Sequence, residues 1–158
     1  MKVMNLMSET PFCCKQTDTV QHAAELMKLH DVGSIPVVND SEERQLLGIV
    51  TDRDICLKVV GAGKAGSSVK VAEVMSKAPT TCHADDSAAS CEALMERHQV
   101  RRVPVVDAQG RCIGIVSQAD IALHDSAKRT SHTVAAISRH HILSKKQASM
   151  HSVGVGMA

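Results

Sequence analysis

Residues 48–54 read GIVTDRD, and residues 114–120 read GIVSQAD. Both stretches run from apolar residues into a hydroxyl residue, two variable positions and an aspartate. The apolar residues are typical of a buried β-strand, and a hydroxyl residue followed three positions later by an acid is typical of a helix start. The same strand-to-helix transition therefore occurs twice in one chain, which indicates an internal repeat.

The two copies align over most of the first 125 residues. At an offset of 68, the matches include Met7-Ser8 with Met75-Ser76, Pro11 with Pro79, Leu26-Met27 with Leu94-Met95, and Pro36-Val37-Val38 with Pro104-Val105-Val106. The offset becomes 66 where Gly48-Ile49-Val50 matches Gly114-Ile115-Val116. The change falls between the polar stretches NDSEERQ and DAQGR, where a turn tolerates a difference in length. These matches indicate a duplication.

Each copy predicts the element order β-α-β-β-α. The short strands are expected at 12–16 and 80–84, and each is followed by a helix that begins at Asp18 in the first copy and at Asp86 or Ser87 in the second. Two strands follow in each copy, at 34–39 and 46–51 and at 102–107 and 111–117. A second helix is predicted to begin at TDRD and at SQAD.

The fold class is therefore α/β (α+β), with two repeats packed as one module with pseudo-two-fold symmetry. The apolar strands lack polar alternation, so both faces of each sheet are expected to be covered. The expected boundaries are repeat 1 at 1–60, a flexible linker at 61–70, repeat 2 at 71–125, and a partly disordered tail at 126–158. One short helix is expected in the tail, around Val134–Leu143.

Composition excludes several classes of function. The formal net charge is +1, and Phe12 is the only aromatic residue among Phe, Tyr and Trp, so a nucleic-acid partner is not expected. Phe12 could stack on a base, but a single Phe is more often a core residue, and the core is expected. The six cysteines form no C-x-x-C pair, and neither a signal-peptide apolar region nor a membrane span is present, so we expect a soluble cytoplasmic protein with reduced thiols and no membrane association.

No enzyme is expected from this sequence. No Ser/Cys–His–Asp set stands at a usable spacing, and GAGKAG at 61–66 lacks the spacing of a phosphate-binding loop. Neither a metal nor another cofactor is expected, because the spacing at Cys82-His83 and His140-His141 does not suit a closed zinc site. His30 and His98 stand at equivalent helix ends, where a structural role is expected.

With the duplicated unit and its closing motif established, the chain resembles a tandem pair of cystathionine-β-synthase (CBS) domains, called a Bateman module. The resemblance covers about residues 1–125 and rests on the Met-Ser-x-x-Pro start, the Pro-Val-Val strand and the Gly-Ile-Val-[Ser/Thr]-x-x-Asp end of each copy. It implies a regulatory protein that binds AMP, ADP, ATP, S-adenosylmethionine or NAD in the cleft between the repeats. It also implies a homodimer and a regulated partner protein that the sequence does not identify.

The closing motif suggests how such a ligand would be held. Thr51 should lie where a strand turns into a helix, so that its hydroxyl and the free N–H groups of the helix start can face a phosphate. Asp54 should then accept hydrogen bonds from the two hydroxyls of the ribose. The resemblance implies the same roles, and Ser117 and Asp120 form the equivalent second site.

The resemblance places the adenine beside the strands of the Pro-Val-Val motifs. These are the residues around Pro36 and Pro104, with Ile35 and Val103 next to them, and Thr81 near the second short strand. Aliphatic walls with a few backbone polar groups suit a flat base.

Arginines are expected to hold the phosphates. Arg53 lies inside the first motif, and Arg101-Arg102 precede the strand of the second copy, where the first copy has Gly33-Ser34. The two sites are therefore expected to differ in phosphate preference.

Two alternatives stay open at this point. Thr51 with Asp54, and Ser117 with Asp120, also fit ordinary capping boxes, and one carboxylate cannot fully serve both a cap and a ribose. A ligand-free dimerisation or scaffolding module is therefore the competing interpretation. A thiol or metal sensor that uses Cys13-Cys14 is a third.

Overall fold

The computed structural model describes residues 1–124 and 131–138 and contains two four-stranded sheets. The first sheet has the order β2 (Cys14–Lys15), β3 (Ser34–Val38), β4 (Leu46–Thr51) and β5 (Ser76–Lys77). The second has the order β1 (Ser8–Glu9), β8 (Cys112–Ser117), β7 (Arg102–Val106) and β6 (Cys82–His83). The predicted α+β fold with two repeats is confirmed.

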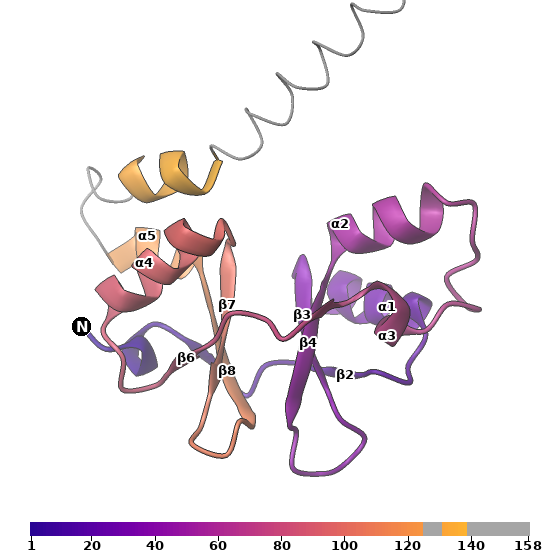
Figure 1. The fold of residues 1–158 in the computed structure, drawn as a ribbon, viewed down its shortest axis with the longest axis horizontal. Helices are drawn as coiled ribbons and strands as arrows, with labels where there is room; N and C mark the ends of the chain where they lie inside the picture. The colour runs from indigo at the N-terminus through magenta and orange to yellow at the C-terminus, as the bar shows by residue number, and fades with distance from the viewer. Residues whose placement is uncertain (125–130, 139–158) are drawn as a thin grey trace, which may run out of the picture.

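Helices cover the outer side of each sheet (Figure 1). The first half carries α1 (Val20–His30), α2 (Asp52–Ile55) with its continuation η2 (Cys56–Val60), and α3 (Val71–Val74). The second half carries η1 (Val3–Asn5), α4 (Ala88–His98) and α5 (Gln118–His124). A further helix at 131–138 follows.

The leading segment of each copy completes the sheet of the other copy. Strand β1 pairs with β8, where Ser8 lies opposite Ile115, and β5 pairs with β4, where Ser76 lies opposite Ile49. Apolar residues of the two leading segments also pack in the core of the opposite repeat. Val3 and Leu6 pack in the second core, and Val71 and Val74 pack in the first. The two halves are therefore interlocked rather than simply stacked.

The two halves also meet where β4 and β8 begin, at a contact that we call the seam (residues 44–46 and 110–112). Gln45 forms a single antiparallel bridge with Arg111. On either side of it, the Cys112 N–H donates to the Arg44 carbonyl at 3.0 Å and the Leu46 N–H donates to the Gly110 carbonyl at 3.1 Å. These two bonds are repeat equivalents, so the pseudo-two-fold axis passes through the bridge.

The predicted helix start at Asp18 is wrong by one residue. Thr19 is the N-cap of α1, where its hydroxyl accepts from the His22 N–H, while an Asp18 oxygen accepts from the Lys15 N–H at 2.7 Å and closes the preceding turn. In the second copy the cap is Ser87. The helix period alone does not separate two adjacent polar residues that both cap well.

The structure describes two further predicted segments, the linker at 61–70 and the helix of the tail. Residues 61–70, predicted as a linker, pack against the start of α1, because the Val20 N–H donates to the Val69 carbonyl at 2.9 Å. The helix predicted around Val134–Leu143 begins earlier, at 131, and is described up to 138. Residues 139–158, and with them most of the predicted disorder, lie outside the described residues.

A first prediction concerns the two glycines of the closing motifs. A Cβ at Gly48 would lie 2.7 Å from the Ser76 carbonyl oxygen, whereas a Cβ at Gly114 would lie 2.6 Å from the sulfur of the flexible Met7 side chain. A side chain can move aside more easily than a paired backbone. We expect Gly48→Ala to lower the free energy of unfolding by about 2–3 kcal/mol and Gly114→Ala by about 1 kcal/mol. Urea unfolding measures both, and equal costs would contradict the argument.

Candidate ligand cleft

A cleft of about 990 Å³ opens between the two repeats, where β3 and β7 begin and β4 ends. A volume of this size accommodates a nucleotide or a similar small molecule. Its walls come from both repeats and from the helix at 131–138: Gly33, Ser34, Ile49, Thr51, Asp52, Arg53, Ser76, Pro79, Thr80, Gln99, Val100, Arg101, Arg102, Ile137 and Ser138.

Four of the residues expected at the ligand site line this cleft, namely Thr51, Arg53, Arg101 and Arg102. Thr51 ends β4 as predicted and is the N-cap of α2. The strand-to-helix transition in the sequence therefore places a hydroxyl at the wall of the cleft. Arg53 and Arg101 approach it from different repeats.

The two motif aspartates are engaged with their own backbone. Asp54 Oδ2 accepts from the Thr51 N–H at 3.1 Å and from the Thr51 hydroxyl at 2.7 Å, and Oδ1 pairs with Lys58 Nζ at 2.8 Å. Asp120 Oδ2 accepts from the N–H and the hydroxyl of Ser117, both at 2.7 Å. In this structure both carboxylates therefore form the bonds of a helix cap, as the capping interpretation expects.

The backbone N–H groups at the start of α2 also have partners. The Asp52 N–H donates to the Gly33 carbonyl at 3.0 Å, the Arg53 N–H to Asp52 Oδ1 at 2.7 Å, and the Asp54 N–H to the Thr51 hydroxyl at 3.1 Å. The sequence suggested free N–H groups here for a phosphate, and this expectation is wrong for the state described. Positive charge at the cleft comes from side chains instead.

The residues expected around the adenine lie behind the cleft wall. Ile35 and Val103 are fully buried in the two cores, and Pro36 and Pro104 are buried within β3 and β7. Thr81 follows Pro79 and Thr80, which do line the cleft. Because side chains alternate along a strand, the face opposite Ile35 belongs to its neighbour Ser34.

Ser34 is the feature of the cleft that sequence reasoning did not single out. Its side chain is 5% exposed and lines the cleft, and its hydroxyl oxygen has no hydrogen-bond partner. A buried hydroxyl without a partner costs about 1–3 kcal/mol. Such a cost is removed when a ligand supplies the missing hydrogen bond.

A cluster of guanidinium groups makes the cleft positive. Arg53, Arg101 and Arg102 all line it, against the single carboxylate of Asp52 among the lining residues. Gly33 leaves room for this arrangement, because a Cβ there would lie 2.9 Å from Asp52 Oδ2 and 3.6 Å from Arg102 Nη1. Arg102 of the second repeat therefore reaches the first repeat's side of the cleft.

The helix at 131–138 forms one edge of the cleft and is anchored on α4. The buried Thr133 hydroxyl donates to Glu92 Oε1 and, at 2.9 Å, to Glu96 Oε1. Ile137 packs in the second core, and Ser138 joins it at the wall of the cleft. Thr133 and Ile137 lie four residues apart, which places them on one face of the helix.

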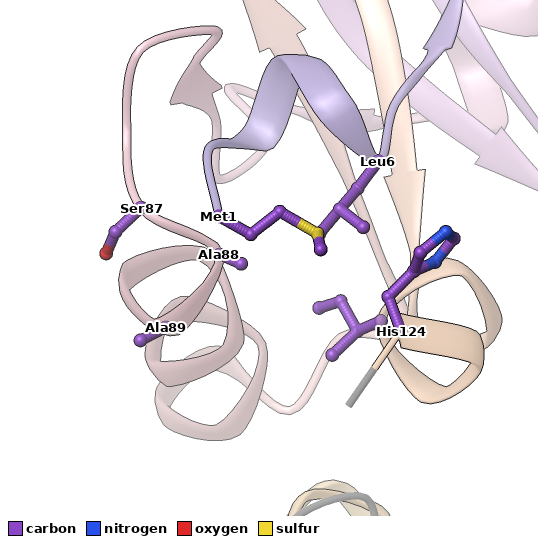
Figure 2. A pocket seen from close by; sticks show the side chains of 7 residues that line it. Met1, Leu6, Ser87, Ala88, Ala89 and His124 are labelled. Carbon is purple, nitrogen blue, oxygen red and sulfur yellow. The ribbon is translucent and has the colours of Figure 1, made fainter. Parts of the chain in front are cut away.

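A second, smaller pocket does not suit a nucleotide. Its volume is about 200 Å³, and it lies between η1, α4 and α5 (Figure 2). Figure 2 shows the Met1 side chain extending toward Leu6, with the His124 ring nearby. His124 Nδ1 lies 2.9 Å from the carbonyl of Asp120 in its own helix. This pocket is below the size of ordinary ligand sites.

Phe12 is not a core residue, contrary to expectation. It is largely exposed and stacks on His30 at the end of α1, with ring centroids 3.3 Å apart. Within residues 1–124 and 131–138, no group of three or more His, Cys, Asp or Glu side chains is arranged to hold a metal ion. In the same ranges, no helix is long and apolar enough to cross a bilayer.

Comparison with known proteins identifies the repeats. The family model for the CBS domain matches residues 3–61 and 71–126. A CBS domain-containing protein YhcV of Bacillus subtilis is 41% identical over 113 residues, which is 72% of this chain and 77% of that protein.

Solved structures share the fold. A structure of Hypoxic Response Protein I with two coordinated zinc ions is 35% identical, with a TM-score of 0.71 over 80% of this chain and all of that one. The CBS domain pair of MJ0100, in complex with 5′-methylthioadenosine and S-adenosylmethionine, is 27% identical, with a TM-score of 0.70 over 78% and 98%. CBSX2 in complex with AMP is 25% identical, with a TM-score of 0.67 over 78% and 94%.

A second prediction tests the docking of the helix at 131–138. Ile137→Ala removes a side chain that packs in the second core, whereas Val134→Ala removes a largely exposed one from the same helix. We expect Ile137→Ala to lower the free energy of unfolding by about 2 kcal/mol, and Val134→Ala to change it by less than about 0.5 kcal/mol. Equal effects in urea unfolding would show that the helix does not rest on α4.

Proposed function

This chain belongs to the CBS domain family as a tandem pair of repeats, and on that premise we propose that it is a regulatory protein that binds an adenosine-containing ligand. The observation that carries the proposal is the buried, unpartnered hydroxyl of Ser34 in a nucleotide-sized cleft with three arginines. Relatives of the same fold contain AMP or S-adenosylmethionine, which supports the ligand class. The protein is proposed to have no catalytic activity of its own.

The charge of the cleft favours a ligand with a phosphate. Guanidinium groups bind phosphate through paired, charge-assisted hydrogen bonds, and Arg53, Arg101 and Arg102 supply them here. The same groups repel the sulfonium cation of S-adenosylmethionine. We therefore propose AMP, ADP, ATP or NAD for this cleft, with Ser34 and Thr51 bonded to the polar edge of the ligand.

The ribose is proposed to bind Asp54, in exchange for the Lys58 ammonium at Oδ1. Oδ2 can keep its two bonds to Thr51 during this exchange. Ser117 and Asp120 are proposed to form the second site. That site is proposed to depend less on phosphate, because the positions equivalent to Arg101 and Arg102 hold Gly33 and Ser34.

Signalling is proposed to pass to a separate partner protein. A ligand that bridges the two repeats favours one arrangement of the halves over others, and a partner can bind that arrangement selectively. A cytoplasmic location is also proposed, and the six free thiols are consistent with a reducing compartment.

A ligand-free scaffolding module is the second candidate. It is favoured by the capping bonds of Asp54 and Asp120, which engage both motif carboxylates without a ligand. The open volume of the cleft and the unpartnered Ser34 hydroxyl favour the ligand-binding interpretation over it.

A homodimer is also proposed. Leu57 on η2 and Leu123 on α5 occupy equivalent positions in the two repeats and are 56% and 81% exposed. Large apolar side chains that remain exposed are candidates for contact with another subunit. A two-fold dimer brings the same patch of both subunits together, and the equivalent leucines of the two repeats are proposed to belong to that patch.

A third prediction tests the dimer. Leu57→Glu combined with Leu123→Glu should convert the dimer to a monomer, because a dimer contact would then bury unpaired carboxylates. Leu29→Glu, at another exposed leucine on α1, should leave the dimer intact. Sedimentation equilibrium measures the mass of each variant. A monomeric native chain, or a dimer that survives both changes, would exclude this surface.

A fourth prediction tests the ligand through Ser34. With a phosphate-bearing ligand at about a hundred times its dissociation constant, the native chain should gain roughly 2.7 kcal/mol of stability. Ser34→Ala should lose at least about 1 kcal/mol of this gain, because the bond to the ligand disappears. The ligand-free variant should be as stable as the native chain or more so, since an unpartnered hydroxyl is removed. Thermal unfolding with AMP, ADP, ATP, NAD and S-adenosylmethionine measures both effects.

The control for this experiment is Ser41→Ala, which removes an exposed hydroxyl bonded to Asn39 and should not alter the ligand effect. No stabilisation of the native chain by any of these ligands would leave the scaffolding interpretation. If the ligand stabilises the Asp54→Ala variant and the Asp120→Ala variant as much as the native chain, the ribose binds elsewhere.

A further inference from the structure

A cysteine and an arginine meet at the seam. Cys13 lies between β1 and β2 and is partly exposed. Arg44 Nη2 lies 3.0 Å from Cys13 Sγ, and the same nitrogen donates to the Pro11 carbonyl at 2.6 Å. The second bond fixes the guanidinium beside the sulfur. A thiolate at Cys13 would therefore have a positive partner in place.

A second cysteine lies on the inner side of this pair. Cys112 begins β8 and is 2% exposed, and its N–H donates to the carbonyl of Arg44. Its thiol donates to the Gly114 carbonyl at 3.7 Å, and its side chain is near enough to interact with that of Cys13. Arg44 thus contacts Cys13 through its side chain and Cys112 through its backbone, so the three residues form one cluster.

The other half of the molecule lacks this cluster. The repeat equivalents of Cys13, Arg44 and Cys112 are Thr81, Gly110 and Leu46. Gly110 has a φ of 77°, and Arg44 adopts the same left-handed conformation with a φ of 56°. A positive φ costs free energy in a residue other than glycine.

The surroundings of Cys13 and Cys112 shift the pKa values of the two thiols in opposite directions. The Cys112 side chain is the largest influence and, with the hydrogen bond and the charge of Arg44, outweighs burial and lowers the pKa of Cys13 to about 6. The neighbouring Cys13 side chain, together with burial, raises the pKa of Cys112 well above its ordinary value. The neighbouring Cys14, which is buried, has its pKa raised to about 12. At neutral pH, one thiolate therefore faces one thiol.

We propose that Cys13 is a peroxide-reactive modification site and that Cys112 is its resolving thiol. The Cys13 thiolate attacks one oxygen of a hydroperoxide, the O–O bond breaks, and the leaving oxygen takes a proton from water. The product is a sulfenic acid on Cys13. The sulfur of Cys112 then attacks the sulfur of Cys13, the S–O bond breaks, and the Cys112 proton leaves with the hydroxide as water. A reduced dithiol returns both residues to thiols.

The resulting disulfide ties the segment between β1 and β2 to the start of β8. It spans the seam, so oxidation links the two halves covalently at a point distinct from the ligand cleft. This reaction does not depend on the proposed ligand and is tested without it.

The test begins with the fully reduced, full-length chain at pH 6.5. Cys13 should react with iodoacetamide at least about tenfold faster than Cys56, although Cys56 is the more exposed, because an ordinary thiol is mostly protonated at this pH. Hydrogen peroxide in slight excess should then produce a Cys13–Cys112 disulfide, located by fragmentation of the linked peptides in mass spectrometry. Arg44→Met should slow both reactions.

Three variants give the controls. Cys112→Ser should stop the reaction at the sulfenic acid, which dimedone traps on Cys13. Cys13→Ser should abolish the disulfide, and Cys14→Ser should retain it. Cys82 and Cys91, buried with their sulfurs 3.8 Å apart, should stay reduced and serve as the internal control for access. Slower alkylation of Cys13 than of Cys56, or a disulfide that uses Cys14 in the native chain, would overturn the proposal.

Discussion

Two short strand pairings, β1 with β8 and β5 with β4, hold the halves of the molecule together. Each involves only two residues per strand, yet each brings a helical turn with at least one buried valine into the opposite core. Neither repeat has a complete sheet or a complete core without the other. The close approach of the paired strands also explains the glycine of each closing motif, because a Cβ at Gly48 or Gly114 would collide with the leading segment of the other repeat.

The same interlocking builds the cleft from both repeats. The start of β3 and the end of β4 are placed next to the start of β7, so that Arg101 and Arg102 face Gly33 and Thr51. The duplication thus gives two repeats with similar backbones, and the residues that differ between them set the charge and the free space of the cleft. Gly33 and Ser34 of the first repeat leave space in the cleft. Arg101 and Arg102 of the second repeat occupy part of that space and carry positive charge.

The sequence predicted the repeat, the strands and the strand-to-helix motif because these depend on local periodicity and on capping chemistry. It did not predict the exchange of leading segments, since pairing between distant two-residue strands leaves no local pattern. It placed Ile35 at the ligand rather than Ser34, although strand alternation with Ile35 and Val37 in the core assigns Ser34 to the other face. It did not decide between capping and ribose binding by Asp54. The structure shows the capping bonds, which a ligand would have to leave in place or replace.

Strand β4 connects the two sites that carry the proposals. It ends at Thr51, on the wall of the cleft, and begins next to Arg44 and the bridge between Gln45 and Arg111. Its hydrogen-bonded neighbours on both sides, β3 and β5, fix its register. A ligand in the cleft and a disulfide at the seam would therefore act on the relative position of the same two halves. Both would do so through a strand whose edge is already held by β5 of the other repeat.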